Sequence, residues 1–162
     1  MEARSTWWPV LVHSVRTAVA AVVSVLVARL FRLPEAYWAP ITTLVITQSS
    51  LGTALAVSWQ RFLGNLLGAI VGAIVAGYFG PNLLVFGISI FILGLLSFLA
   101  RSDRSAYRFA GVTLAIVMLV PRTGPAWIVA LHRFAEVSIG IAVALVLTVV
   151  WPESKDTPAG KG

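Results

Sequence analysis

Long apolar stretches without charged residues recur along the whole chain, and they restrict what it can fold into. Hydrophobic residues make up 59% of the sequence and charged residues 11%, whereas a soluble domain is nearer half apolar and a quarter charged. Apolar runs of this kind are typical of helices that cross a lipid bilayer. The sequence therefore predicts an all-α integral membrane protein.

Six transmembrane helices are predicted from these runs and from the Gly and Pro residues between them. At ~1.5 Å per residue the second and fifth helices reach only about 22 Å, less than a hydrocarbon core of ~30 Å. Tryptophan rings favour the membrane interface, and all of them fall at predicted helix ends: Trp7, Trp8, Trp38, Trp59, Trp127 and Trp151. The predicted helices are 8–30, 36–50, 59–79, 82–100, 106–120 and 128–151.

The distribution of Lys and Arg predicts the orientation of the chain, because cytoplasmic loops carry more of them. One side would hold Arg4, Arg61, Arg101, Arg104, Arg108, Lys155 and Lys161, and the other Arg29, Arg32, Arg122 and Arg133. Both termini are therefore expected in the cytoplasm of a multi-pass inner-membrane protein. Its parts would be a short N-terminal segment (1–7), a membrane module (8–152) and a disordered tail (153–162).

An internal repeat divides this module into two three-helix units, 8–79 and 82–151. The stretch 36–46 returns in part at 106–116. At one constant spacing, Arg61, Phe62 and Gly68 match Arg133, Phe134 and Gly140. Chance matching in an apolar alphabet is the alternative, but it does not account for the paired Arg-Phe and Gly. Because each unit has an odd number of helices, the two are expected to be inverted repeats with a substrate site where they meet.

The two short helices are expected to line the path of a substrate, since unusually short segments at matching positions mark such sites. Threonine hydroxyls can instead bond to the backbone of their own helix, which is the structural alternative. The first short helix carries Thr42, Thr43, Thr47 and Gln48 after Pro40. The residues predicted to lie on the pathway are Pro40, Thr43, Thr47 and, in the second unit, Thr113.

Four charged residues within predicted helices are also candidates for the pathway. Arg61 and Arg133 stand at the start of predicted helices, where free N–H groups and the positive charge would together attract an anion. For Arg61 the alternative is a snorkelling anchor. Arg16 lies inside the first predicted helix, where a charge normally faces the bundle interior. Glu136 is either a proton-coupling acid or an ion-pair partner of Arg133 or Arg16, and the ion pair is favoured.

Small residues at four-residue spacing predict close helix packing. The predicted third helix carries Gly64, Gly68 and Gly72, and the sixth carries Gly140. Such residues let another backbone approach closely. We expect these glycines to hold the bundle together rather than to contact a substrate.

The residue inventory argues against other function classes. The chain has no cysteine, so disulfides and thiol chemistry are excluded. Its two histidines, His13 and His132, have no metal-ligand spacing, and no catalytic or phosphate-binding motif is present. The net charge of +6 is not gathered in a basic run, which favours lipid headgroups over nucleic acid as its partner. No enzyme activity, cofactor or metal is expected.

Four motifs spread over nearly the whole chain carry a family resemblance. They are Tyr-Trp-Ala-Pro-Ile-Thr at 37–42, Gln60-Arg61-Phe62-x-Gly64-x-x-x-Gly68, Arg133-x-x-Glu136-x-x-x-Gly140, and Val-Val-Trp-Pro at 149–152. With these motifs the chain resembles the membrane module of the fusaric acid resistance / aromatic acid exporter family. It is similar, more distantly, to the plant aluminium-activated malate channels.

The resemblance implies efflux or conduction of small organic anions, especially aromatic carboxylates, by six-helix modules that work in pairs. It also places Pro40, Thr43, Arg61, Arg133 and Glu136 on family motif positions. Larger members carry a second membrane module and a soluble domain that are not found here, so a homodimer is expected. The expected function is export of small carboxylates. The alternative is a non-transporting membrane scaffold or a subunit of a larger export assembly.

Overall fold

The computed structural model describes residues 3–47, 50–99, 104–121 and 124–151, and all regular structure within them is helical. The prediction of an all-α protein is therefore confirmed for the part of the chain described. The helices are α1 (Ala3–Leu30), α2 (Trp38–Ile46), α3 (Leu51–Phe79), α4 (Leu83–Leu99), α5 (Arg104–Leu119) and α6 (Ala126–Val150).

Three of these helices are long and apolar enough to cross a membrane. The spans are Val10–Leu30 in α1, Leu51–Phe79 in α3 and Ala126–Val150 in α6. Helices α4 and α5 are apolar but shorter, at 17 and 16 residues. Helix α2 has only 9 residues, so at ~1.5 Å per residue it extends about 14 Å and cannot cross a hydrocarbon core alone.

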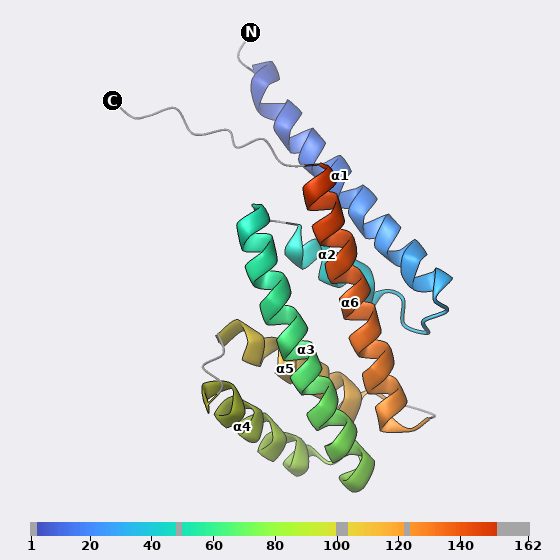
Figure 1. Cartoon of the computed structure of the whole chain (residues 1–162). Helices are drawn as coiled ribbons and strands as arrows, with labels where there is room; N and C mark the ends of the chain where they lie inside the picture. The colour runs from blue at the N-terminus through green and yellow to red at the C-terminus, as the bar shows by residue number, and fades with distance from the viewer. Residues whose placement is uncertain (1–2, 48–49, 100–103, 122–123, 152–162) are drawn as a thin grey trace.

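Helix α3 lies at the centre of the bundle and runs in the opposite direction to α6 (Figure 1). It contacts four other helices and packs most extensively on α5 and α6. Helix α2 is held between α1 and α6, while α4 packs on α5. The start of α1 and the end of α6 lie at the same end of the bundle (Figure 1).

Glycines on one face of α3 allow α5 to approach its backbone. A Cβ atom at Gly64 or Gly68 would clash with the carbonyl oxygens of Ala106 and Ala110. One turn further, a Cβ at Gly72 would lie 3.0 Å from the Cβ of Val117. Since real Cβ atoms do not approach backbone this closely, only glycine permits the packing at positions 64 and 68, whereas a side chain at position 72 would require Val117 to shift. In this structure the three glycines face α5.

Gly140 does the same for α6 and α2. A Cβ there would lie 2.5 Å from the carbonyl oxygen of Ala39 and 2.6 Å from the Cβ of Thr42. The short helix α2 is therefore seated directly on the backbone of α6.

Several predicted helix ends were wrong. Helix α3 begins at Leu51 rather than at Trp59, because Ser50 precedes a helix-compatible apolar run and the N–H of Ala54 already donates to the Ser50 carbonyl. Trp59 consequently lies inside a helix. Helix α1 begins at Ala3, so Trp7 and Trp8 are likewise internal.

Helix α2 is shorter than the predicted 36–50. It begins at Trp38 and ends at Ile46, with Pro40 in its first turn, where the missing N–H breaks no helical hydrogen bond. The predicted polar residue Gln48 lies outside the described residues. Helix α2 is therefore even shorter than the sequence predicts.

Candidate functional site

Two buried arginines lie in α3 and α6, which are long and apolar enough to cross a membrane. Arg61 on α3 is 9% exposed and Arg133 on α6 is 3% exposed. Both lie well inside their helices, which begin at Leu51 and Ala126. The predicted attraction of an anion by a helix N-terminus was therefore wrong for Arg61, which is far from the free N–H groups of α3. Because neither side chain lies at the surface, Arg61 and Arg133 should not be counted among the loop Lys and Arg residues that predict the orientation of the chain.

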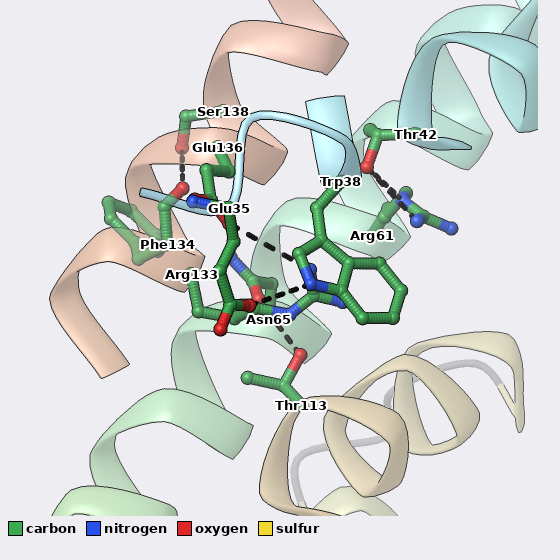
Figure 2. A network of polar contacts seen from close by, with 10 residues as sticks. All are labelled: Glu35, Trp38, Thr42, Arg61, Asn65, Thr113, Arg133, Phe134, Glu136 and Ser138. Atoms are coloured by element: carbon green, nitrogen blue, oxygen red, sulfur yellow. Dashed lines mark hydrogen bonds and ion pairs between the residues drawn. The ribbon is translucent and has the colours of Figure 1, made fainter. Parts of the chain in front are cut away.

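Arg133 stacks on the indole ring of Trp38, the first residue of α2. Its guanidinium carbon lies 3.5 Å from the ring centroid. The indole Nε1–H donates to Glu35 Oε2 at 2.9 Å, and the backbone N–H of Glu35 donates to Glu136 Oε1 at 3.1 Å (Figure 2). The connection between α1 and α2 is thereby fixed to α6 through side chains one turn apart.

Glu136 and Arg133 form the favoured ion pair, but their contact is long. Arg133 Nη1 and Glu136 Oε2 are 4.0 Å apart, and Glu136 is completely buried. Neither atom has a hydrogen-bond partner, and the Nε of Arg133 also lacks one. Buried charged groups with unmade hydrogen bonds are costly. This pair therefore retains unused capacity to bind another polar group.

Arg61 has a different environment. Its Nε and Nη2 both donate to Thr42 Oγ1 of α2, at 3.3 and 3.0 Å, and its guanidinium carbon lies 4.8 Å from the ring centroid of Phe109 on α5. Within residues 3–47, 50–99, 104–121 and 124–151, no carboxylate lies within ion-pair distance of Arg61. A hydroxyl and an aromatic ring are thus its main polar contacts, and its charge is not balanced.

Two features of the packing recur around both arginines. Arg61 stacks on Phe109 and Arg133 stacks on Trp38, while Gly68 and Gly140 receive the carbonyls of Ala110 and Ala39. These contacts align α2 with α5 in a register that differs by one residue from the repeat seen in the sequence, in which 36–46 matches 106–116. By contact, the counterpart of Thr113 is Thr42, whereas the sequence comparison had paired Thr113 with Thr43.

Asn65 lies one turn beyond Arg61 and is also buried. Its Oδ1 accepts a hydrogen bond of 2.8 Å from the hydroxyl of Thr113 on α5 (Figure 2). Its Nδ2 has no partner. Residues four apart share one helix face. A buried donor without a partner, Asn65 Nδ2, therefore lies on the same face as Arg61.

The predicted lining residues of α2 bond within the protein. Thr43 donates to the carbonyls of Ala39 and Gly140, at 3.0 and 3.1 Å, and Thr47 donates to the carbonyl of Thr43 at 2.6 Å. Both threonines are buried, and Pro40 is half-buried in the same helix. The structural alternative, in which these hydroxyls satisfy backbone groups, therefore describes this conformation.

Arg16 lies apart from the other arginines. It is buried, and its Nη2 donates to Thr148 Oγ1 on α6 at 3.2 Å. Ala20, Ser24 and Ala28 continue the same buried face of α1, so Arg16 faces the interior of the bundle. Thr148 follows Glu136 by three turns, about 18 Å along the helix.

Electrostatics link Arg61 with Arg133. Arg61 contributes a repulsive charge interaction to Arg133, while Glu136 and Glu35 contribute attractive ones. Two buried cations therefore act on each other inside the membrane helices, next to one fully buried carboxylate. Among the described residues no group of three or more His, Cys, Asp or Glu side chains could hold a metal ion. The buried charged groups of this site are thus two guanidinium groups and one carboxylate.

Sequence reasoning missed several residues of this cluster. Trp38 was assigned to the membrane interface, and Asn65 was not among the predicted pathway residues. Glu35 and Phe109 were not singled out. The spacing between Arg61 and Asn65 was a signal for the latter, but the stacking of each arginine on the other half of the chain could not be read from either half.

Comparison with known proteins decides the family. A family profile described as "Fusaric acid resistance protein-like" matches residues 19–147. The chain belongs to this family. The family resemblance drawn from the motifs at 37–42, 60–68, 133–140 and 149–152 is thereby confirmed.

Curated relatives of the family include three proteins of Escherichia coli K12. The chain is 32% identical over 150 residues to "Inner membrane protein YeeA", covering 88% of this chain and 41% of YeeA. It is 26% identical over 156 residues to "Uncharacterized transporter YdhK", covering 91% of this chain and 23% of YdhK. It is 25% identical over 142 residues to "Inner membrane protein YccS", covering 87% of this chain and 20% of YccS.

The chain thus spans about two fifths of YeeA and less than a quarter of YdhK and YccS. No solved structure matches it significantly. The names of the relatives and the apolar helices together support a location in the inner membrane.

Proposed function

We propose that this family member is a module of a membrane transporter that carries small organic anions, chiefly aromatic or other small carboxylates, out of the cell. The observation that supports this most is the pair of buried arginines, Arg61 and Arg133, in two membrane-spanning helices. Charged residues at such positions are expensive and usually mark substrate or ion pathways. Their positive excess selects for anions.

Aromatic character near the arginines supports carboxylates that carry a ring. Each guanidinium already lies on an aromatic face, provided by Trp38 or Phe109. A flat substrate could stack beside these rings while its carboxylate meets the guanidinium groups, whose forked donors fit a carboxylate well. The YdhK name, which calls that relative a transporter, is consistent with this proposal.

An inverted repeat of two three-helix units is part of the same proposal. The matched contacts of Arg61 with Phe109 and of Arg133 with Trp38 are what such a repeat would produce, as are the opposite directions of α3 and α6 (Figure 1). In this arrangement α4, α5 and the connections around α2 complete the passage through the membrane. We propose that the chain acts as a homodimer with both termini in the cytoplasm.

Substrate access requires part of the wall to move, because both arginines are buried in this conformation. Helix α2 is the best candidate for the moving part. It has only 9 residues, and it covers Arg61 through Thr42 and Arg133 through Trp38. Displacement of this one helix would uncover both guanidinium groups.

The test is carboxylate flux in liposomes that contain the purified chain. Liposomes that contain wild-type protein should release preloaded benzoate. Arg61→Ala and Arg133→Ala should each reduce the rate of benzoate release by about tenfold or more. Arg108→Ala, at an exposed position of α5, is the matched control. Helical content and elution volume would establish that the variants fold.

Two results would contradict the proposal. If liposomes with wild-type protein release no member of a panel of aromatic and dicarboxylic acids faster than empty liposomes, the chain does not transport carboxylates. If flux occurs but both alanine variants retain it, the arginines are not on the pathway. The first result would favour the non-transporting scaffold or subunit of an export assembly.

A further inference from the structure

Both arginine sites have an aromatic ring under the guanidinium, but only one of them has a carboxylate one turn away. Glu136 follows Arg133 by one turn of α6, and Gly64 occupies the same place after Arg61 on α3. A side chain cannot be accommodated at Gly64, because the Ala106 carbonyl fills the space that its Cβ would need. One site therefore has a built-in carboxylate and the other has none.

Hydrogen-bond donors outnumber acceptors around this asymmetric pair. Arg133 Nε and Nη1 and Asn65 Nδ2 are buried donors without partners, whereas Glu136 Oε2 is the only buried carboxylate oxygen without one in the described residues. Arg61 directs two donors at the single hydroxyl of Thr42. Unsatisfied buried donors cost free energy. A bound anion would supply the missing acceptors.

The buried charges in the cluster also leave a definite remainder. Arg61 and Arg133 are cationic, and an ionised Glu136 offsets one of them. Glu35 is half-buried in the connection before α2 and already accepts from Trp38, so water screens its charge more effectively. Arg16 bonds to Thr148, three turns away. Among Arg61, Arg133 and Glu136, one positive charge therefore remains without a buried carboxylate in the described residues.

We propose that Glu136 sets the valence of the bound anion. With Glu136 ionised, the site balances one monocarboxylate, whose oxygens bond to Arg61, Asn65 and Arg133. A dicarboxylate would bring an excess negative charge into a buried site, which is strongly unfavourable. This inference rests on the proposed function, because it assumes that Arg61 and Arg133 hold the transported anion. It assigns to Glu136 a specificity role in place of a merely structural ion pair.

Glu136→Gln tests the inference, because it removes the charge and keeps the acceptor oxygen for the N–H of Glu35. Benzoate and terephthalate have the same ring and differ by one carboxylate. In wild-type protein, benzoate should bind more tightly by titration calorimetry in detergent and move faster in liposomes. In the variant, the ratio of the two affinities should shift toward terephthalate by about tenfold or more. Glu153→Gln removes one negative charge from the C-terminal segment and controls for net charge.

Asn65→Asp provides a second test that does not depend on the folding of Glu136→Gln. Asn65→Asp is nearly isosteric and adds a carboxylate one turn from Arg61, so it should abolish benzoate binding. The double variant with Glu136→Gln restores the original sum of buried charges. It should recover preference for benzoate over terephthalate, which loss of packing alone would not produce.

The outcomes separate the two proposals. If wild-type protein binds benzoate but the benzoate-to-terephthalate ratio is the same in Glu136→Gln, the valence role is wrong and the transport proposal stands. Failure of the double variant to regain benzoate preference would contradict the valence role in the same way. If wild-type protein neither binds nor moves any carboxylate, both proposals fall together.

Discussion

The guanidinium carbon of Arg133 lies 3.5 Å from the centre of the Trp38 ring, so the last helix holds the shortest one through a charge on an aromatic face. Trp38 also donates to Glu35, which fixes the chain just before α2. A single ring therefore links the connection between α1 and α2 to the middle of α6. Changes to this ring should affect both the stability of the bundle and the position of α2.

Replacement of Trp38 should be costly and should depend on the ring. Trp38→Leu removes the face under Arg133 and the donor to Glu35, so the free energy of unfolding should fall by about 2 kcal/mol or more. Trp38→Phe retains an aromatic face under Arg133, so its free energy of unfolding should fall less. The measurement is thermal unfolding in detergent micelles. Trp127, 60% exposed on α6, is the control, and an equal loss in Trp127→Leu would contradict the role given to Trp38.

Gly68→Ala should destabilise the contact between α3 and α5. The new Cβ would meet the Ala110 carbonyl, which is backbone and cannot move without the helix, so the expected cost is about 1–3 kcal/mol. Gly77→Ala on the same helix has open space and should be neutral or slightly stabilising, because alanine favours a helix by about 1 kcal/mol over glycine. Denaturation of the two variants side by side checks this, and similar behaviour of both would refute the packing.

Arg61→Lys should weaken anion binding although it keeps the charge. Lysine lacks the planar fork that bonds twice to Thr42 and stacks on Phe109. We expect benzoate affinity to fall by about tenfold or more, with some binding retained because the positive charge remains. Arg108→Lys on the exposed face of α5 should bind normally. Wild-type affinity in Arg61→Lys would show that charge alone matters.

The membrane orientation can be tested with single cysteines, because the native chain has none. Cysteines at Trp8 and Val150 should react with a membrane-impermeant thiol reagent only when the cytoplasmic face is exposed. Cysteines at Tyr78, near the end of α3, and at Trp127, near the start of α6, should react only from the opposite face. All four positions are exposed in the structure. Labelling of all four from one side would exclude the proposed topology.

The helical class and the packing glycines could be predicted because they depend on short-range patterns. Apolar runs specify membrane helices by length, and glycines at four-residue spacing form one smooth face whatever packs on it. The partner of that face was not predictable. That α5 would pack on Gly64 and Gly68, and α2 on Gly140, depends on contacts between distant segments that leave no local signal.

The charged residues show the same division. Their presence inside apolar helices indicated a functional role, and the ion pair of Glu136 with Arg133 followed from their spacing. The error in the start of α3 placed Arg61 at a helix end and suggested the wrong source of attraction for an anion. Ser50 was the local signal that could have corrected it. The donor excess around Asn65 required three-dimensional contacts and was beyond the sequence.

The placement of α2 also has a consequence for biosynthesis. Trp38 and Thr42 belong to an early segment, whereas Arg133 and Gly140, against which α2 packs, are synthesised more than eighty residues later. A ribosome delivers α2 to the membrane well before α6 exists. Until then, the 9-residue helix α2 lacks its packing surface on α6. Arg61 likewise lacks its aromatic partner until Phe109 has been synthesised. Insertion into the bilayer and completion of the core are therefore separate events, and the second must follow the release of α6 from the translocation machinery.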